Sequence, residues 1–239
     1  MISLQDVEKN YQLGETIVRA LRGSNVEIEE GEFIAVMGPS GSGKSTLMNM
    51  IGALDVPSEG EVNIDGEEIN QMSENQLALL RSKKIGFIFQ EFNLINSMNA
   101  RQNVALPMIF RNTPKKKRVE RADELLEEVG LGDRKTFRPS ELSGGQRQRV
   151  SIARSLANNP DIILADEPTG NLDTETGSKI MDLLTELNDE GKTIIMVTHD
   201  PNDAEYADRI VRIVDGKTNP DEDLENQEKL KNKEKDDEN

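Results

Sequence analysis

The sequence of 239 residues contains no cysteine and no tryptophan, and only 3% of it is aromatic. The absence of cysteine excludes disulfides and thiolate metal sites, and it fits a reducing compartment. No apolar run approaches the roughly 18 to 20 residues that cross a bilayer, and nothing near Met1 looks like a signal peptide. We therefore expect a soluble chain that reaches a membrane only through a partner. The length suits one large domain with room for an inserted subdomain.

Acidic residues outnumber basic ones, 45 Asp and Glu against 29 Lys and Arg, which gives a formal net charge of −16 at pH 7. Such an excess argues against a surface for nucleic acid or anionic lipid. Part of the charge is local, since residues 219–239 hold four lysines against nine acidic residues. We expect residues 218–239 to form a disordered acidic tail. The basic run Lys115–Arg118 opens a helix that continues with five acidic residues, so we interpret it as a solvated helix face.

The stretch GPSGSGKST follows an apolar strand at 33–37 and precedes an apolar helix at 47–51. Its three glycines allow backbone conformations that turn successive N–H groups toward one point, where the helix dipole also favours an anion. Lys44 is then placed to reach the β- and γ-phosphates of a nucleotide, and the Ser45 hydroxyl to bind magnesium. A plain glycine-rich turn is the alternative. The predicted phosphate site comprises Gly38, Pro39, Ser40, Gly41, Ser42, Gly43, Lys44, Ser45 and Thr46.

Two adjacent carboxylates, Asp166 and Glu167, end a second apolar strand at 162–165. In a parallel sheet with the phosphate loop at its carboxyl edge, this strand end points to the same crevice. Asp166 is placed to hold magnesium and Glu167 to accept a proton from the attacking water. These roles supply the positioning and charge neutralisation that phosphoryl transfer needs. A helix-capping pair before Pro168 is the alternative.

Two further features are ambiguous on their own. The only histidine, His199, follows a strand at 193–198 and could hydrogen-bond the γ-phosphate, although a lone histidine is more often structural. The stretch from Leu142 to Gln146 places a serine and two glycines before a helix, which makes a second anion site from free N–H groups. It could equally be an ordinary helix cap.

Strand and helix patterns divide the chain into parts of different character. Residues 2–30 alternate in short apolar and polar runs, as half-buried antiparallel strands do. Residues 91–159 show helical spacing without a strand-like run, which indicates a helical insertion, and the rest alternates strand and helix around a mainly parallel sheet. The later strands are expected at 61–64, 85–89, 162–165, 193–198 and 210–214, and helices at 73–84, 119–129, 146–158 and 175–189.

Together these residues resemble the nucleotide-binding subunit of ABC transporters, over residues 1–217. GPSGSGKST is similar to that family's Walker A motif, IILADE to its Walker B motif and LSGGQ to its signature. The resemblance implies a P-loop NTPase core with a mainly parallel sheet, an N-terminal antiparallel β subdomain and an α-helical subdomain inserted at about 91–159. The remaining motifs of the family match Gln90 (Q-loop), Tyr11 (the A-loop that stacks on adenine), Asp173 (D-loop) and His199 (switch histidine).

The resemblance implies an ATPase that uses magnesium and acts as a head-to-tail homodimer. The implied catalytic residues are Glu167, His199, Lys44 and Gln90. The implied metal ligands are Ser45, Gln90 and Asp166.

In such a dimer, the signature of one copy completes the nucleotide site of the other, and Asp173 lies on the dimer seam. ATP-driven closure would power a membrane permease on a separate chain. The protein is therefore expected in the cytoplasm, at the inner face of the cell membrane. The residues acting in trans would be Ser143, Gly144, Gly145 and Gln146.

The phrases GETIVRALRG, IGFIFQEFNLI, ALPMIF and ADEPTGNLDTETG resemble more closely the subgroup that serves macrolide export, lipoprotein release and peptide export. That likeness implies a peptide, lipoprotein or drug as cargo. The alternative is an ABC ATPase that drives signalling or mechanotransmission across the membrane without transport. ABC machines acting on DNA or ribosomes carry coiled-coil insertions or fused ATPase halves, and GTPases carry N-K-x-D, none of which occurs in this sequence.

Overall fold

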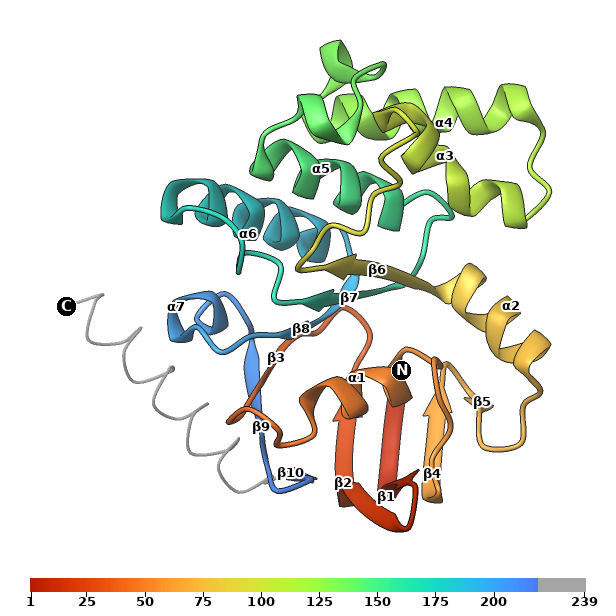
Figure 1. Cartoon of the computed structure of the whole chain (residues 1–239), viewed down its shortest axis with the longest axis vertical. Helices are drawn as coiled ribbons and strands as arrows, with labels where there is room; N and C mark the ends of the chain where they lie inside the picture. Colours follow the sequence, from red (N-terminus) through yellow and green to blue (C-terminus); the bar gives the residue numbers. More distant parts are fainter. Residues whose placement is uncertain (219–239) are drawn as a thin grey trace. The chain divides into compact units, whose positions relative to one another are not determined.

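The computed structural model describes residues 1–218, and the rest of the predicted acidic tail, residues 219–239, lies outside the described residues (Figure 1). Thr218, where the tail was expected to begin, belongs to a short strand. The chain divides into two compact units. The first contains Met1–Leu77 and the chain from Ile195 onward, and the second contains Ala78–Ile194.

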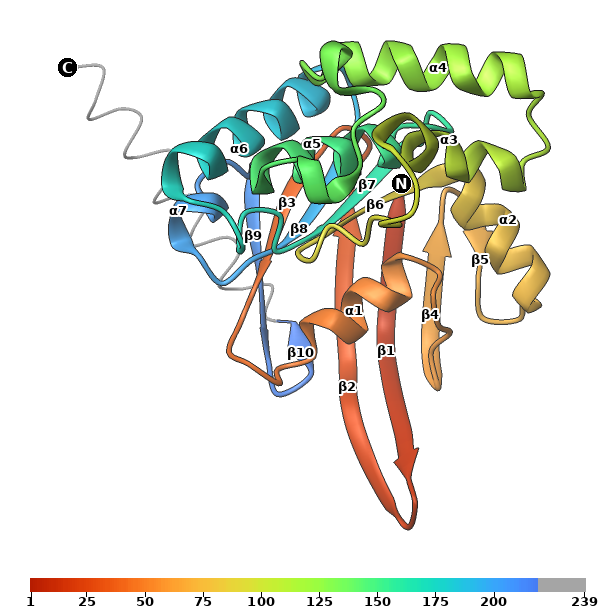
Figure 2. The same cartoon turned by 45° about the horizontal axis from the view of Figure 1, so that its top comes forward.

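An antiparallel sheet opens the first unit, as the alternating pattern of residues 2–30 predicts. Ile2 pairs with Ile28 and Leu13 with Thr16, so the first two strands form one long hairpin, which Figure 2 shows at full length. Alternate side chains such as Leu4 and Val26 are buried, because successive residues of a strand face opposite sides. The strand order is β2-β1-β4-β5. The strands are β1 (Ile2–Leu13), β2 (Thr16–Ile28), β4 (Glu59–Ile64) and β5 (Glu67–Glu68).

The first unit also contains parallel strands that support the glycine-rich loop. Strand β3 (Phe33–Met37) is buried over four of its five residues and pairs in parallel with β9 (Arg209–Val214). The loop leads from β3 into helix α1 (Lys44–Ile51), whose residues Leu47 and Ile51 are buried. Helix α7 (Pro201–Ala204) and strand β10 (Lys217–Thr218) are too short for a periodic pattern and were not predicted.

The second unit combines parallel strands with helices. Strands β6 (Ile85–Phe89) and β7 (Ile162–Asp166) pair in parallel. No strand occurs between them among the residues described, so the helical character of residues 91–159 is confirmed. The helices of this stretch are α3 (Ala100–Phe110), α4 (Lys115–Glu128) and α5 (Gly144–Ser155), with 3-10 turns at Gly132–Arg134 and Pro139–Glu141.

Three helices show how local sequence sets their limits. Helix α2 (Glu74–Lys84) is preceded by Ser73, whose N–H donates to the Gln76 side chain at 2.9 Å, as in a capping box. Helix α6 (Thr174–Asp189) buries one apolar face, and strand β8 (Thr193–Val197) follows it with every residue buried. Helix α3 was not predicted, although Asn99 caps it, because it contains Pro107, which normally indicates a helix boundary.

The basic run at the start of α4 behaves as a solvated face. The Lys116 side chain is 87% exposed, and its closest acidic partner, Glu120, lies 3.8 Å away. The buried residues of α4 are Ala122, Leu125 and Leu126 on the opposite side. Within residues 1–218, no helix is long and apolar enough to cross a membrane.

Candidate nucleotide site

The glycine-rich loop of the first unit has no room for side chains at two of its glycines. A Cβ at Gly38 would lie 2.1 Å from the carbonyl oxygen of Ile213, and a Cβ at Gly43 would lie 2.6 Å from that of Ala20. Gly43 also has a φ of 109°, which is strained for any residue with a side chain. Strands β2 and β9 therefore pack directly against the backbone of this loop.

This loop presents an anion site at the start of α1. Gly43 is the N-cap and provides no side chain to occupy the first N–H groups of the helix. The Lys44 ammonium lies over the loop, where it donates to the carbonyl oxygens of Gly38 at 2.8 Å and Pro39 at 3.0 Å. The buried Ser42 hydroxyl has no hydrogen-bond partner in the part of the chain that the structure describes. Hydrogen-bond donors and a nearby cation are what a polyphosphate requires.

His199 reaches the same edge of the first unit. The N–H of Thr198 donates to the carbonyl oxygen of Val36 at 3.3 Å, just beyond the end of β8. His199 directly follows Thr198, and Gly38 lies two residues after Val36. His199 and Gly38 therefore follow the ends of β8 and β3, which are neighbouring strands. His199 is exposed to solvent.

Tyr11 of β1 is held by a pair of charged residues that sequence reasoning missed. Its hydroxyl donates to Asp55 at 3.1 Å, while the Lys9 ammonium bonds the other oxygen of Asp55 at 2.6 Å and lies 5.2 Å from the Tyr11 ring centroid. Burial, and then the Asp55 carboxylate, raise the pKa of Tyr11, whereas the Thr46 and Asn49 side chains lower it slightly. Those two side chains belong to α1, so Tyr11 and the start of α1 lie close together within this unit.

Asp55 remains a carboxylate in this arrangement. Burial alone would raise its pKa, but the hydrogen bonds from Lys9 and from the Val56 N–H outweigh it and lower the pKa of Asp55. Lys9 lies two residues before Tyr11 on one strand face, which is a weak sequence signal. Asp55 lies 44 positions away in sequence and carries no such signal.

The second unit brings Gln90, Asp166 and Glu167 to one strand edge. Phe89 pairs with Asp166 in the parallel register, so Gln90 and Glu167 each follow the last paired residue. A Cβ at Gly170 would lie 2.9 Å from Gln90 Nε2 and 3.4 Å from Glu167 Oε2, so both side chains border this glycine. Glu167 has a φ of 44°, a strained conformation of the kind that gathers at functional sites.

Asp166 and Glu167 do not cap a helix. Glu167 is followed by a turn in which the Gly170 N–H donates to the Glu167 carbonyl oxygen at 3.1 Å. The next helix, α6, begins at Thr174 and has Asp173 as its N-cap. The helix-capping alternative for the carboxylate pair is therefore wrong.

Ser143 caps α5 in the second unit. Its hydroxyl accepts from the Gln146 N–H at 3.3 Å, and the Gln146 side chain accepts from the Ser143 N–H at 3.0 Å. Gly145 is buried, and a Cβ there would lie 2.3 Å from the Thr176 side chain. Thr176 donates in turn to Asp173 through its N–H at 3.0 Å and its hydroxyl at 2.7 Å, and these bonds lower the pKa of Asp173. The signature and the D-loop aspartate are thus packed together.

Each unit therefore holds part of the predicted set. The first brings together Tyr11, the phosphate loop with Lys44 and Ser45, and His199. The second brings Gln90 close to Asp166 and Glu167, and brings Ser143 to Gln146 close to Asp173.

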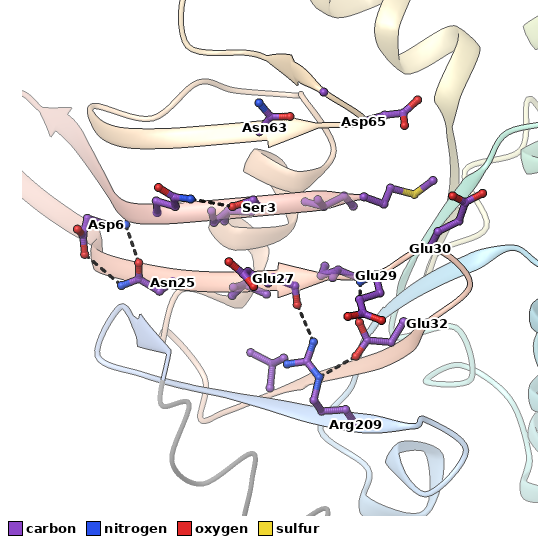
Figure 3. Close-up of a pocket in the computed structure, with 18 residues that line it drawn as sticks. Ser3, Asp6, Asn25, Glu27, Glu29, Glu30, Glu32, Asn63, Asp65 and Arg209 are labelled. Atoms are coloured by element: carbon purple, nitrogen blue, oxygen red, sulfur yellow. Dashed lines mark hydrogen bonds and ion pairs between the residues drawn. The ribbon is translucent and has the colours of Figure 1, made fainter.

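A hollow of about 1550 Å³ lies elsewhere on the first unit, and Figure 3 shows its lining. Glu27, Glu29 and Glu30 border it, together with Arg209, which is paired with Glu32 at 2.7 Å. None of the residues that line it belongs to the phosphate loop. Its carboxylates would repel phosphates, so the nucleotide site is not in this hollow.

Comparison with known proteins identifies the family. The chain matches the ABC transporter family model over residues 21–170. An ABC transporter ATP-binding protein of Thermotoga maritima is 54% identical over 217 residues, which cover 91% of this chain and 93% of that protein. The ABC transporter ATP-binding protein MJ0796 of Methanocaldococcus jannaschii is 52% identical, with 94% and 97% covered. The macrolide export ATP-binding/permease protein MacB of Bdellovibrio bacteriovorus is 50% identical over 94% of this chain and 34% of its own length.

Solved structures agree with the sequence relatives. A dimeric structure of the ATP-binding cassette MJ0796 in a post-hydrolysis state, bound to ADP and Pi, superposes with a TM-score of 0.84 at 50% identity and covers 91% of this chain and 96% of that one. A second dimeric structure of MJ0796, a bacterial ABC transporter cassette, also gives 0.84, at 52% identity, with 91% and 96% covered. The predicted fold class and family are confirmed. The chain belongs to the ABC transporter family and is an ATP-binding cassette ATPase.

Proposed function

We propose that this protein is the ATP-hydrolysing subunit of a transporter, in which two copies close head to tail around ATP and drive a separate membrane permease. The observation that carries the proposal is the phosphate loop, which has no room for a side chain at Gly38 and Gly43 and whose helix start is left open. The subgroup resemblance implies a peptide, lipoprotein or drug as the exported or extracted cargo, and MacB, by its name a macrolide exporter, supports a drug. The protein would work in the cytoplasm at the inner face of the cell membrane.

Each residue near the phosphates has a distinct task in this proposal. The loop N–H groups and Lys44 bind the β- and γ-phosphates, and Tyr11 stacks on adenine. Glu167 accepts a proton from the attacking water, and His199 hydrogen-bonds the γ-phosphate. Gln90, beside Glu167 at the strand edge, helps to orient the water.

Magnesium fits the residues present. Ser45, Gln90 and Asp166 offer the oxygen ligands that this ion prefers. The described residues contain no cluster of three or more acidic, histidine or cysteine side chains that could hold a metal alone. That pattern suits an ion that takes its other ligands from phosphates and water. When bound, magnesium would neutralise charge on the phosphates.

The signature would act on the nucleotide of a second copy. Ser143 is exposed at the start of α5, where it caps the helix together with Gln146. The N–H groups of Gly144 and Gly145 follow at that helix start and can stabilise negative charge in trans. Asp173, packed next to them through Thr176, would lie on the dimer seam. The dimeric structures of MJ0796 support the pairing of two copies.

A separate permease is supported by the relatives themselves. MacB is by its name an ATP-binding and permease protein in one chain, of which only 34% aligns with this chain. MJ0796 and the Thermotoga maritima relative are ATP-binding proteins that this chain covers almost entirely. We therefore place the permease on another polypeptide.

The substitution Glu167→Gln tests the proposal. The variant should bind ATP but hydrolyse it at least about a hundredfold more slowly, because general-base catalysis contributes roughly 10² to 10⁴. With ATP it should elute from size exclusion as a dimer. The exposed Glu30→Gln variant, which lies outside all of the motifs, is the matched control and should hydrolyse normally. Near-normal turnover by Glu167→Gln would exclude it as the base, and a persistent monomer would contradict the shared site.

A further inference from the structure

The turn that carries Gln90 ends in two strained residues. Gln90 and Glu91 are its central residues, and the N–H of Phe92 closes it by donating to the Phe89 carbonyl oxygen at 3.2 Å. Phe92 and Asn93 follow with φ values of 61° and 48°. The left-handed conformation costs roughly 1–2 kcal/mol for each residue with a side chain. Something outside the turn must therefore hold it in this shape.

Two arginines of α5 contact this strained end. Arg154 donates from both terminal nitrogens, to the carbonyl oxygen of Asn93 and to that of Phe92 at 2.9 Å. Arg147, two helical turns earlier on the same helix, places its guanidinium 5.0 Å from the centroid of the Phe92 ring. Burial lowers the pKa of the Arg154 guanidinium, and in a desolvated setting a charged donor bonds a carbonyl more strongly than in water.

The same helix also holds the segment that follows Glu167. The buried Gln148 side chain donates to the Pro168 carbonyl oxygen at 2.6 Å. On the far side of the turn, Asn171 donates to the Gln90 carbonyl oxygen at 2.9 Å. The turn and the Glu167 segment are thus both attached to the helix that begins with the signature.

We propose that Arg147 and Arg154 are positioning residues for hydrolysis, which hold the Gln90 turn against α5 so that Gln90 stays beside Glu167. The role in turnover rests on the proposed function. Arg154 acts through the backbone carbonyl groups of residues 92 and 93, and Arg147 acts through the Phe92 ring. Without Arg154, the two carbonyl groups lose their donors, Phe92 and Asn93 relax to extended conformations, and the turn opens.

Hydrogen exchange measures this attachment without any catalysis. In the full-length protein, Arg154→Met should speed exchange of the Phe92 and Asn93 amides by about tenfold or more, because two charge-assisted hydrogen bonds are lost. Arg154→Lys, which can reach only one carbonyl at a time, should give an intermediate value, and Arg147→Met about two- to fivefold.

Arg149→Met is the matched control, because Arg149 lies on the same helix and donates to the Val129 carbonyl oxygen at 3.2 Å. This variant should speed amide exchange near residue 129 and leave amide exchange in the Gln90 turn unchanged. Unchanged exchange at Phe92 and Asn93 in Arg154→Met would overturn the proposal. So would a uniform rise across both units, which would make Arg154 a general stabiliser.

Turnover tests whether Arg154 acts through Gln90. Arg154→Met should lower kcat about tenfold and change KM for ATP by less than about twofold, since the phosphate loop and Tyr11 lie in the other unit. In a Gln90→Ala background, Arg154→Met should have almost no further effect on kcat. If the losses in kcat caused by Arg154→Met and Gln90→Ala were additive in the double variant, the positioning role would be overturned. If the wild-type protein does not hydrolyse ATP at all, the proposed function fails, while the exchange measurement still decides the attachment.

Discussion

Removing the Tyr11 ring should weaken the binding of ATP without weakening the binding of inorganic tripolyphosphate, which has no base. Stacking of a base on an aromatic side chain contributes roughly 1–3 kcal/mol by alanine substitution, which corresponds to about 5- to 150-fold in Kd. The hydroxyl of Tyr11 is fixed by Asp55 at 3.1 Å, and Lys9 lies 5.2 Å from the ring centroid. Because the ring is already held, little side-chain entropy remains to be lost on binding. We therefore expect the Kd of Tyr11→Ala for ATP to rise by a factor toward the upper end of this range.

The assay is isothermal titration calorimetry in a Glu167→Gln background, which prevents hydrolysis during the measurement. Inorganic tripolyphosphate has no base, so its Kd should change by less than about twofold in Tyr11→Ala, as expected for a site built from the glycine loop and Lys44. Tyr206→Ala is the matched control, since Tyr206 is the only other tyrosine and is 38% exposed. Tyr11→Phe keeps the ring and should lose less than about threefold.

Two results would refute this reasoning. An equal loss of affinity for ATP and tripolyphosphate would mean that Tyr11 supports the phosphate loop through its contacts with α1, and not the base. An unchanged ATP affinity in Tyr11→Ala would remove the ring from the nucleotide site altogether.

Two further predictions concern residues that cap or hold the site. Ser143→Ala should lower the rate of ATP hydrolysis, and the lost helix cap should reduce the free energy of unfolding by roughly 0.5–2 kcal/mol. The ATP affinity of the monomer, measured by calorimetry, should stay within about twofold. A large loss of monomer affinity would place Ser143 in the nucleotide site of its own chain. Asp55→Asn should reduce the free energy of unfolding by about 1–2 kcal/mol at pH 7 in urea titrations. The pKa of Asp55 is lowered in the folded protein, so its stabilisation is present above its ordinary pKa of 3.8 and is lost as pH falls through the folded-state value. The difference should therefore shrink at pH 3, and an equal difference at both pH values would exclude the ion pair as its cause.

The parts of the site that could be predicted from the sequence are those fixed by covalent neighbours. Strand, glycine loop and helix follow one another between Phe33 and Ile51, and each glycine of that loop is required by its own backbone angle or by a direct contact. The residues at the strand edge could be predicted equally well, because Gln90 and Glu167 each follow an apolar strand and the parallel register aligns the two strand ends. Whether the two units assemble these parts into one catalytic site stays a prediction.

At the start of α5, the helix cap named as an alternative is present, but the helix begins earlier than predicted. The helix was expected from Gln146, yet it begins at Gly144 with Ser143 as its cap. Serine followed three residues later by glutamine is the capping-box pattern, and the same pattern occurs at Ser73 before α2. Glycine disfavours helix interiors, which argues against a helix that includes Gly144 and Gly145. The cap and the close packing of Gly145 on Thr176 outweigh that preference.

The contacts that no local pattern could predict are side-chain supports between distant positions. Asp55 meets Tyr11 across 44 positions, and Arg154 meets Phe92 across 62. Each pair requires the tertiary fold before its members become neighbours, and each supports a residue that a family motif does identify. Motif residues of this kind are recognisable because backbone geometry or phosphate chemistry fixes the amino acid at each position. A residue that supports them needs only a donor side chain of suitable length at the right place in the fold. Substitutions at Lys9, Asp55 and Arg154 should consequently reduce binding or turnover only through Tyr11 and Gln90, and lose their effect when those two residues are already removed.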